Sequence, residues 1–247
     1  AAPDPILALF ASGEQGVYVN PFDPATRWQG LNSETVVAEN DDPLGLLKDL
    51  SGNGNNYFVD DAALRPKYIG EGLFRLDGVD YLLTTAGYAN PKVPWYFCWV
   101  TKPPAANGFN GFNLNSGISN YVHFAVEATG RLNGQIRGKI ATPEVSFDGN
   151  VNSSGNTLSG LSVVEALHES GQVTYFNNGM SMGSDISPWT DAVASNWRSG
   201  FSTRSGTGAG NNIVEFGNSL QINRIPSAVE RQVVRETFAA RHGITLP

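Results

Sequence analysis

The chain has 247 residues, of which 40% are hydrophobic and only 16% charged, so it can bury a substantial core and is not intrinsically disordered. Its net charge is −7 and it has no cluster of Lys and Arg, which argues against nucleic-acid binding, since the phosphate backbone requires a basic surface. No segment approaches the ~20 apolar residues of a membrane-spanning helix. Cys98 is the only cysteine and is expected to be a buried, inert thiol.

The first 48 residues are expected to be an irregular lead-in to the main fold. Residues 3–12 are expected to begin it with a short helix, because Pro3 and Pro5 stand where a helix start tolerates proline. Short strands are expected near residues 16–19 and 35–38, and further prolines break the rest of this segment.

From residue 57 on, strand signals recur at intervals of about ten residues, as in a sandwich or jelly roll. The 28 Gly and 23 Asn of the chain favour the many turns that such a fold needs. Asn178-Gly179 predicts a type I′ hairpin, whose two central residues need positive φ. The expected strands are 57–59, 73–77, 80–85, 95–101, 121–128, 131–139, 143–147, 160–168, 171–176, 180–183, 200–204 and 212–223.

The last part of the chain is expected to be helical. Ser227 and Glu230 have the spacing of a capping box, and the helix should run to about Arg241 with Gly243 as its C-cap. His242 is expected to be a cation that complements the helix dipole. The buried face of the helix is predicted from its apolar residues, Val229, Val233, Val234 and Phe238. No linker or repeat divides the chain.

Four segments in chain order carry a family resemblance: 16–24, 46–55 with the following Arg65-Pro66, 74–80, and 225–246. The hairpin at 175–179 agrees with them. Together they resemble the concanavalin A-like, laminin-G-like jelly-roll superfamily, in the branch found in bacteriophage virion proteins and bacterial surface proteins. The resemblance implies an all-β fold: one domain over residues 1–247, made of two antiparallel sheets in a β-sandwich with a C-terminal α-helix at 227–242.

This scaffold carries lectins, adhesins, enzymes and structural modules, so fold does not fix function. The resemblance implies a non-catalytic fibre, spike or decoration module on a virion surface. It would bind host cell-surface polysaccharide, sit beside other virion proteins, and act as a homo-oligomer or in many copies, where avidity compensates for weak single sites. One alternative is a purely structural capsid or tail component.

A second alternative is a polysaccharide hydrolase or lyase. A retaining glycosidase needs two carboxylates placed across the scissile bond, and the Glu-x-Asp-x-Glu motif that supplies them in relatives does not occur in the sequence. One Cys and three widely separated His give no zinc-ligand spacing.

Two turns rich in Asn, Asp and Gly hold candidate calcium ligands. Ca²⁺ takes 6–8 oxygens from carboxylates, amides and carbonyls, and the turns could supply them if they meet at one end of a sheet. The candidate ligands are Asp49, Asn53, Asn55, Asp77 and Asp80. The alternative is that these side chains form Asx-turns with the backbone. Many relatives carry a second Asp where this chain has Tyr81, which counts against calcium. No other cofactor is expected.

Two segments interpreted as loops, 105–115 and 187–198, are the candidate glycan-binding surface. Amides, carboxylates and Arg can hydrogen-bond sugar hydroxyls, and aromatic rings can stack on C–H faces. The candidate residues are Asn107, Asn110, Trp189, Asp191, Asn196, Trp197 and Arg198. The alternative is that both Trp residues fold back and cap the core. Trp28, Trp95 and Trp99 are expected in the core.

Overall fold

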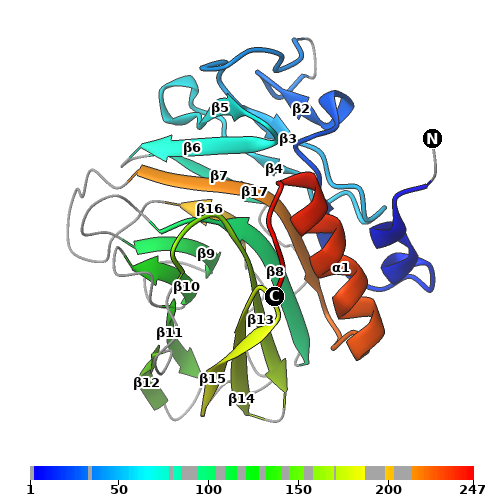
Figure 1. Ribbon diagram of the computed structural model, residues 1–247. Helices are drawn as coiled ribbons and strands as arrows, with labels where there is room; N and C mark the ends of the chain where they lie inside the picture. Colours follow the sequence, from blue (N-terminus) through cyan, green and yellow to red (C-terminus); the bar gives the residue numbers. More distant parts are fainter. Residues whose placement is uncertain are drawn as a thin grey trace.

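The computed structural model describes residues 3–32, 35–77, 80–84, 94–103, 109–115, 121–127, 132–140, 145–152, 158–169, 171–186, 198–202 and 213–247. Over these residues the protein is a β-sandwich: two antiparallel sheets and a C-terminal α-helix, α1 (Ala228–Arg241) (Figure 1). The predicted fold class is therefore confirmed.

Sheet A has the strand order β15-β14-β13-β8-β17-β6-β5, and β1 also pairs with β17. Its strands are β1 (Gly16–Val19), β5 (Lys67–Gly70), β6 (Leu73–Asp77), β8 (Trp95–Thr101), β13 (Ser162–Glu169), β14 (Gln172–Asn177), β15 (Met180–Ile186) and β17 (Ile213–Ile222). The β14–β15 hairpin has the predicted Asn178-Gly179 turn, with φ of 49° and 86°.

Sheet B has the strand order β12-β11-β10-β9-β16-β7-β4-β3-β2. Its strands are β2 (Arg27–Trp28), β3 (Leu46–Leu47), β4 (Tyr57–Phe58), β7 (Tyr81–Thr84), β9 (Phe109–Asn115), β10 (Tyr121–Glu127), β11 (Leu132–Ile140), β12 (Val145–Asn152) and β16 (Arg198–Ser202). The three 3-10 helices of the described chain lie near the N-terminus: η1 (Pro5–Phe10), η2 (Pro24–Thr26) and η3 (Ala62–Leu64).

Strand β8 is buried along its whole length, as its continuous apolar sequence predicts. Because successive residues alternate between the faces of a strand, β8 contributes to two cores. Trp95, Phe97 and Trp99 join the cluster between the sheets, with Leu82 of sheet B. Each such side chain contributes about 2–3 kcal/mol by leaving water.

The second core lies between the other face of sheet A and the helices α1 and η1. It includes Tyr96, Cys98 and Val100 of β8, together with Val234 and Phe238 of α1. Figure 1 shows α1 (red) on one side of the molecule and β9–β12 (green) on the other, with β8, β13 and β17 between them. Burial, followed by the nearby Glu165 carboxylate, raises the pKa of the Cys98 thiol, so the expected inert thiol is confirmed.

The helix α1 begins with the predicted capping box between Ser227 and Glu230. Its buried face differs from the prediction in its first turn, because Val229 is 71% exposed there. No helix among the described residues is long and apolar enough to cross a membrane.

Some N-terminal elements also differ from expectation. Val36 makes only an isolated bridge with Trp28, where a strand was expected at 35–38. Trp28 was expected in the core but is half-buried, with the Lys48 ammonium 4.7 Å from the centre of its ring. Residues 3–12 do begin with a helix, but it is the 3-10 helix η1, for which Asp4 is the N-cap.

Candidate functional site

The turn at 49–55 is held together by the carboxylate of Asp49. This carboxylate accepts hydrogen bonds from the backbone N–H groups of Tyr18 (2.9 Å), Ser51 (2.8 Å) and Asn55 (2.9 Å), and from the Ser51 hydroxyl (2.8 Å). Both oxygens therefore already serve as acceptors, and the bond to Ser51 is that of an Asx-turn.

The two amides of this turn attach it to strand β1. Asn53 Nδ2 donates to the carbonyls of Glu14 and Gly16, both at 3.1 Å. Asn55 Nδ2 donates to the same Gly16 carbonyl at 2.8 Å. Gly52 and Gly54 have φ of 88° and 74°, a conformation that glycine adopts without strain. The turn at 49–55 is thus hydrogen-bonded to the start of strand β1 in sheet A.

The second turn joins β6 of sheet A to β7 of sheet B. Asp77 donates its backbone N–H to Asp80 Oδ2 at 3.0 Å. The side chain of Asp80 is 3% exposed, and this burial, as the largest cause, raises the pKa of Asp80 to about 6. Asp80 is therefore a carboxyl group that holds a proton more readily than usual.

The two turns lie at opposite ends of strand β17. Gly16, to which Asn53 and Asn55 bond, pairs with Ile222, whereas Asp77 pairs with Ile213. At ~3.3 Å per residue the two ends are roughly 30 Å apart. The structure therefore does not bring Asp49, Asn53, Asn55, Asp77 and Asp80 into one site, and the condition for the expected calcium site is not met. The described residues contain no group of three or more His, Cys, Asp or Glu that could hold a metal ion.

Most of the predicted glycan-binding residues lie outside the described residues: Asn107, Trp189, Asp191, Asn196 and Trp197. For these five the prediction stands as made. The remaining two lie in strands, since Asn110 belongs to β9 and Arg198 opens β16. The segment 109–115, interpreted from sequence as loop, is therefore a strand. Arg198 pairs with Asn115, so strand alternation places Arg198 and Asn110 on opposite faces of sheet B.

The register of β9–β12 and β16 defines the two faces of this half of sheet B. Leu82 of β7 is buried between the sheets and pairs with Phe201 of β16, which pairs with Phe112 of β9. When the register is followed from β16 through β9, β10 and β11 to β12, the residues on this face are apolar or Gly, with Asn110 and Ser199 as exceptions. This is the face of sheet B that belongs to the core.

The residues on the opposite face are almost all polar, and we call this set the polar face. It comprises Asn113, Asn115, Tyr121, His123, Glu127, Asn133, Gln135, Arg137, Lys139, Ser146, Asp148, Asn150, Asn152, Arg198 and Ser202. The apolar residues and glycines on this face are Phe109, Gly111, Ala125 and Gly200. Amides are the commonest group of the polar face.

Cross-strand pairing arranges the polar face in rows that run across five strands. One row is Arg198–Asn115–Tyr121–Arg137–Asp148, and the next is Gly200–Asn113–His123–Gln135–Asn150. Neighbours in a row are about 4.8 Å apart along the hydrogen-bonding direction of the sheet. Each row therefore places polar residue types, with Tyr121 or His123 at its middle, along a line roughly 19 Å long.

Sequence reasoning missed most of the polar face, although the signal for single strands was present. The apolar and polar residues of 121–127 roughly alternate, which is typical of a strand with one polar side, and Tyr121–Glu127 is a strand. What the sequence did not show was the pairing of five strands in a register that adds their polar sides together. The nominated Arg198 does belong to this surface, at the end of one row.

Two buried carboxylates of sheet A are engaged in ion pairs. Glu165 is fully buried and binds Arg235 of α1 at 2.7 Å. Glu215, also buried, pairs with Lys102 and with Arg75, the latter at 3.1 Å. Each of these two carboxylates is thus balanced by a basic side chain.

Comparison with known proteins identifies the fold and no closer relationship. No protein-family model matches the chain, and no curated protein matches it. The botulinum neurotoxin serotype D binding domain is similar in structure, with a TM-score of 0.55 and 14% identity over 77% of this chain and 49% of that chain. The binding domain of Paraclostridial Mosquitocidal Protein 1 has a TM-score of 0.54 and 13% identity, over 89% of this chain and 52% of that one.

An enzyme shares the fold as well. Trypanosoma rangeli sialidase in complex with sialic acid has a TM-score of 0.56 and 12% identity, over 94% of this chain and 34% of that one. This chain spans about a third to a half of the length of these structures. At such identities the likeness shows the β-sandwich fold and no more.

Proposed function

We propose that this protein is a non-catalytic glycan-binding module whose binding surface is the polar face of sheet B. The observation that carries the proposal is the register of β9–β12 and β16, which collects amides, two Arg, a His and a Tyr on one face. Amides and Arg offer paired donors and acceptors that match vicinal hydroxyls, and Tyr offers a ring with a polar end.

The similar structures support this proposal by precedent. Two of them are named binding domains, and the sialidase was solved with a sugar bound. The candidate residues Trp189 and Trp197 would add stacking rings from the segment that precedes Arg198 in the chain. A fibre, spike or decoration role on a virion surface, in multiple copies, rests on the sequence resemblance to phage proteins and remains a prediction.

The test is a binding screen of the full chain against a glycan array and envelope polysaccharides of candidate hosts. Gln135→Ala and Asn150→Ala remove two amides that pair across β11 and β12, and each should weaken binding roughly 5- to 10-fold. Gln172→Ala is the matched control, since Gln172 is exposed on β14 of sheet A and bonds only to Ser184 nearby. The control should bind like the wild type.

Three results would change this proposal. If no glycan binds and the protein docks tightly into a particle, the structural alternative replaces it. If glycans bind but both polar-face variants match Gln172→Ala, the surface is wrongly placed. If incubation with the bound polysaccharide releases reducing ends or unsaturated products, the protein is an enzyme.

A further inference from the structure

One row of the polar face continues into the half of sheet B that is formed by β2, β3, β4 and β7. Gly200 of the polar face pairs with Leu83 of β7, and Leu83 pairs with Phe58 of β4. The register then leads through β3 to β2, where an isolated bridge adds one more residue. Directly paired residues lie on the same face of a sheet, so this end of the row faces outward, as the polar face does. We call its last residues the apolar row: Phe58, Leu46, Trp28 and Val36.

The burial of the apolar row agrees with this placement. Leu47, next to Leu46 in β3, belongs to the core between the sheets, so strand alternation turns Leu46 to the other face. Leu46 is 6% exposed but belongs to neither of the two core clusters of the described residues. On either side of it Trp28 and Phe58 are half-buried, and Val36 is 37% exposed. The row thus has two partly exposed aromatic side chains with a buried leucine between them.

Aromatic and aliphatic residues are unusual on the outer face of an antiparallel sheet, which is commonly polar. Apolar surface that is rimmed by polar residues is typical of interaction sites. The apolar row is narrow, however, since a stable protein–protein interface takes about 20–30 residues from each partner. Its size therefore suits a thin ligand, and its continuity with the polar face suits a ligand that carries hydroxyl groups as well as apolar surface.

The spacing of the two aromatic residues fits a sugar chain. Strand β3 separates Trp28 from Phe58, so their backbones are two strand spacings, roughly 10 Å, apart, which is close to the length of a disaccharide. Sugar rings have C–H faces that stack on aromatic rings and hydroxyls that bond to polar groups. Lys48 supplies such a group, because its ammonium lies 4.7 Å from the centre of the Trp28 ring and can donate to a hydroxyl of a sugar bound there.

We infer that the apolar row is a further glycan subsite, in which Trp28 and Phe58 stack on the sugar rings of an unbranched polysaccharide that runs across the strands. This inference rests on the glycan-binding function proposed above. A chain must have at least three sugar units to reach both aromatic residues, one at each end of the disaccharide spacing. Longer oligosaccharides should therefore bind more tightly than disaccharides of the same kind, which reach only one ring.

The experiment adds chitohexaose, cellohexaose and maltohexaose, and the disaccharides chitobiose, cellobiose and maltose, to the full chain. NMR of the isotope-labelled tryptophan indole N–H groups follows binding, with each signal assigned by a Trp→Phe substitution. The indole N–H of Trp28 donates to the Ala25 carbonyl at 3.2 Å, so its signal reports on the position of this ring. We expect at least one hexasaccharide to shift the Trp28 signal saturably and to bind about 3- to 10-fold more tightly than its disaccharide.

Substitutions then test the two aromatic residues. Trp28→Ala and Phe58→Ala should each weaken binding of that hexasaccharide roughly 3- to 10-fold. Phe58→Leu, which keeps an apolar side chain but no ring, should weaken binding as Phe58→Ala does, whereas Phe58→Tyr should bind like the wild type. Phe176→Ala is the matched control, because Phe176 is a half-buried aromatic residue on β14 of sheet A, and it should bind like the wild type.

The outcomes are distinguishable from those of the proposed function. If glycans bind on the array but no hexasaccharide shifts the Trp28 signal, or if Trp28→Ala and Phe58→Ala both match Phe176→Ala, the inference is overturned while glycan binding stands. A Phe58→Leu protein that binds like the wild type overturns stacking at Phe58. No binding to any oligosaccharide or array glycan overturns the proposed function and this inference together. Thermal unfolding of each variant identifies any loss of binding that comes from misfolding.

Discussion

Arg235 of helix α1 donates a 2.7 Å hydrogen bond from Nε to Oε1 of Glu165, whose side chain is fully buried in strand β13. The hydroxyl of Tyr96 on β8 donates to the other carboxylate oxygen at 3.0 Å. The Arg235 guanidinium also lies over Gly179 in the β14–β15 turn, where an added Cβ would approach it to 2.8 Å. One buried charge therefore connects the helix, two strands and a hairpin.

Removing Arg235 should leave this charge without its counter-ion. We expect Arg235→Met to lower the free energy of unfolding by about 3 kcal/mol, because an unpaired buried carboxylate is costly. Equilibrium urea unfolding measures the loss. Arg231→Met is the control on the same helix: Arg231 lies 5.5 Å from the centre of the Phe176 ring, and its loss should cost about 0.5–1 kcal/mol. Equal effects of the two substitutions would contradict the assigned role of the pair.

His242 should make the protein less stable in acid. Burial, followed by the neighbouring Arg241, lowers the pKa of His242 from 6.5 to about 4. The unfolded chain therefore takes up a proton between pH 6.5 and 4 that the folded protein does not, so this contribution to stability is complete above pH 6.5 and is lost as pH falls towards 4. The half-buried ring limits the loss to about 2 kcal/mol.

Unfolding free energies at pH 7 and pH 4.5 test this for the wild type and for His242→Gln. Asp80 acts in the opposite direction, since its raised pKa of about 6 makes its contribution present below pH 3.8 and lost as pH rises through 6. Because it lacks the histidine, the His242→Gln variant should lose less stability on acidification than the wild type. An unchanged pH dependence in His242→Gln would mean that the histidine is charged in the folded protein after all.

Gly217 should be intolerant of any side chain. It lies at the register shift of β17, and a Cβ there would come within 2.4 Å of the His242 ring. We expect Gly217→Ala to cost about 2–3 kcal/mol by overpacking, measured by thermal unfolding. In the double variant Gly217→Ala/His242→Ala the smaller residue should relieve the clash, so the two losses should not add. Additive losses would place the strain elsewhere.

Asp49 should stabilise the fold independently of calcium. Asp49→Ala leaves three backbone N–H groups and the Ser51 hydroxyl without their acceptor, a loss of about 2–4 kcal/mol. Asp61→Ala, which removes a single helix-cap bond to Ala63, should cost about 1 kcal/mol. Chemical unfolding in EDTA and in millimolar CaCl₂ should give the same differences. A saturable stabilisation of the wild type by calcium would show a cation at this turn.

Sequence reasoning worked best where local pattern and tertiary environment agree. Strand β8 was predicted at its observed bounds, because its uninterrupted apolar sequence between prolines fits a strand buried on both faces. The capping box of α1 and the Asn178-Gly179 turn were also correct, since both are local devices whose geometry depends on few neighbours.

The predictions fail where residues far apart in the sequence determine the local structure. Strand β9 is rich in Asn and Gly, which favour a turn, but its pairing with both β10 and β16 outweighs that local preference. His242 was expected to be a cation because it ends a helix, but burial against Gly217 and the edge of the Phe22 ring favours the neutral form. The same limit applies to the polar face, which exists only through the register of separate strands.

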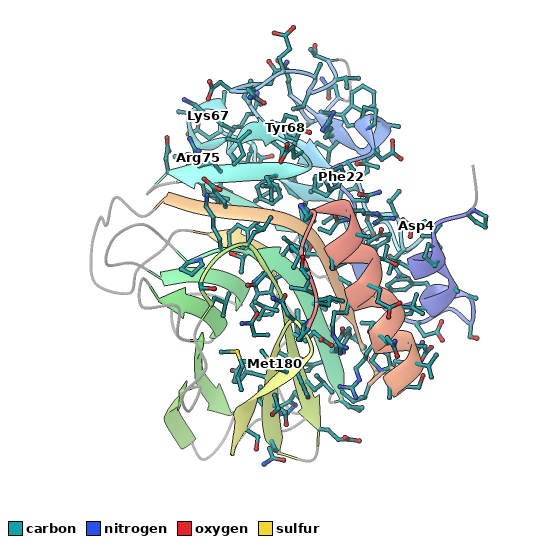
Figure 2. The ribbon with its side chains drawn as sticks, viewed as in Figure 1. Asp4, Phe22, Lys67, Tyr68, Arg75 and Met180 are labelled. Atoms are coloured by element: carbon teal, nitrogen blue, oxygen red, sulfur yellow. The ribbon has the colours of Figure 1, made fainter. Side chains whose placement is uncertain are left out.

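Figure 2 shows Lys67 and Arg75 near each other on β5 and β6, where their register pairs them. Glu215 takes up the charge of Arg75 and of Lys102, so this basic group on sheet A is partly neutralised within the protein.

Strand β17 pairs with β1 through Gly16 and Ile222, and Asp4 bonds Arg241 at 2.8 Å. Contacts between residues so far apart in sequence cannot form during synthesis until the last part of the chain has left the ribosome. Strand β1 therefore lacks its partner strand β17 while the residues between them are synthesised. Contacts of this sequence separation also slow folding. A partner or chaperone that covers the edge of β1 during that interval would raise the yield of folded protein.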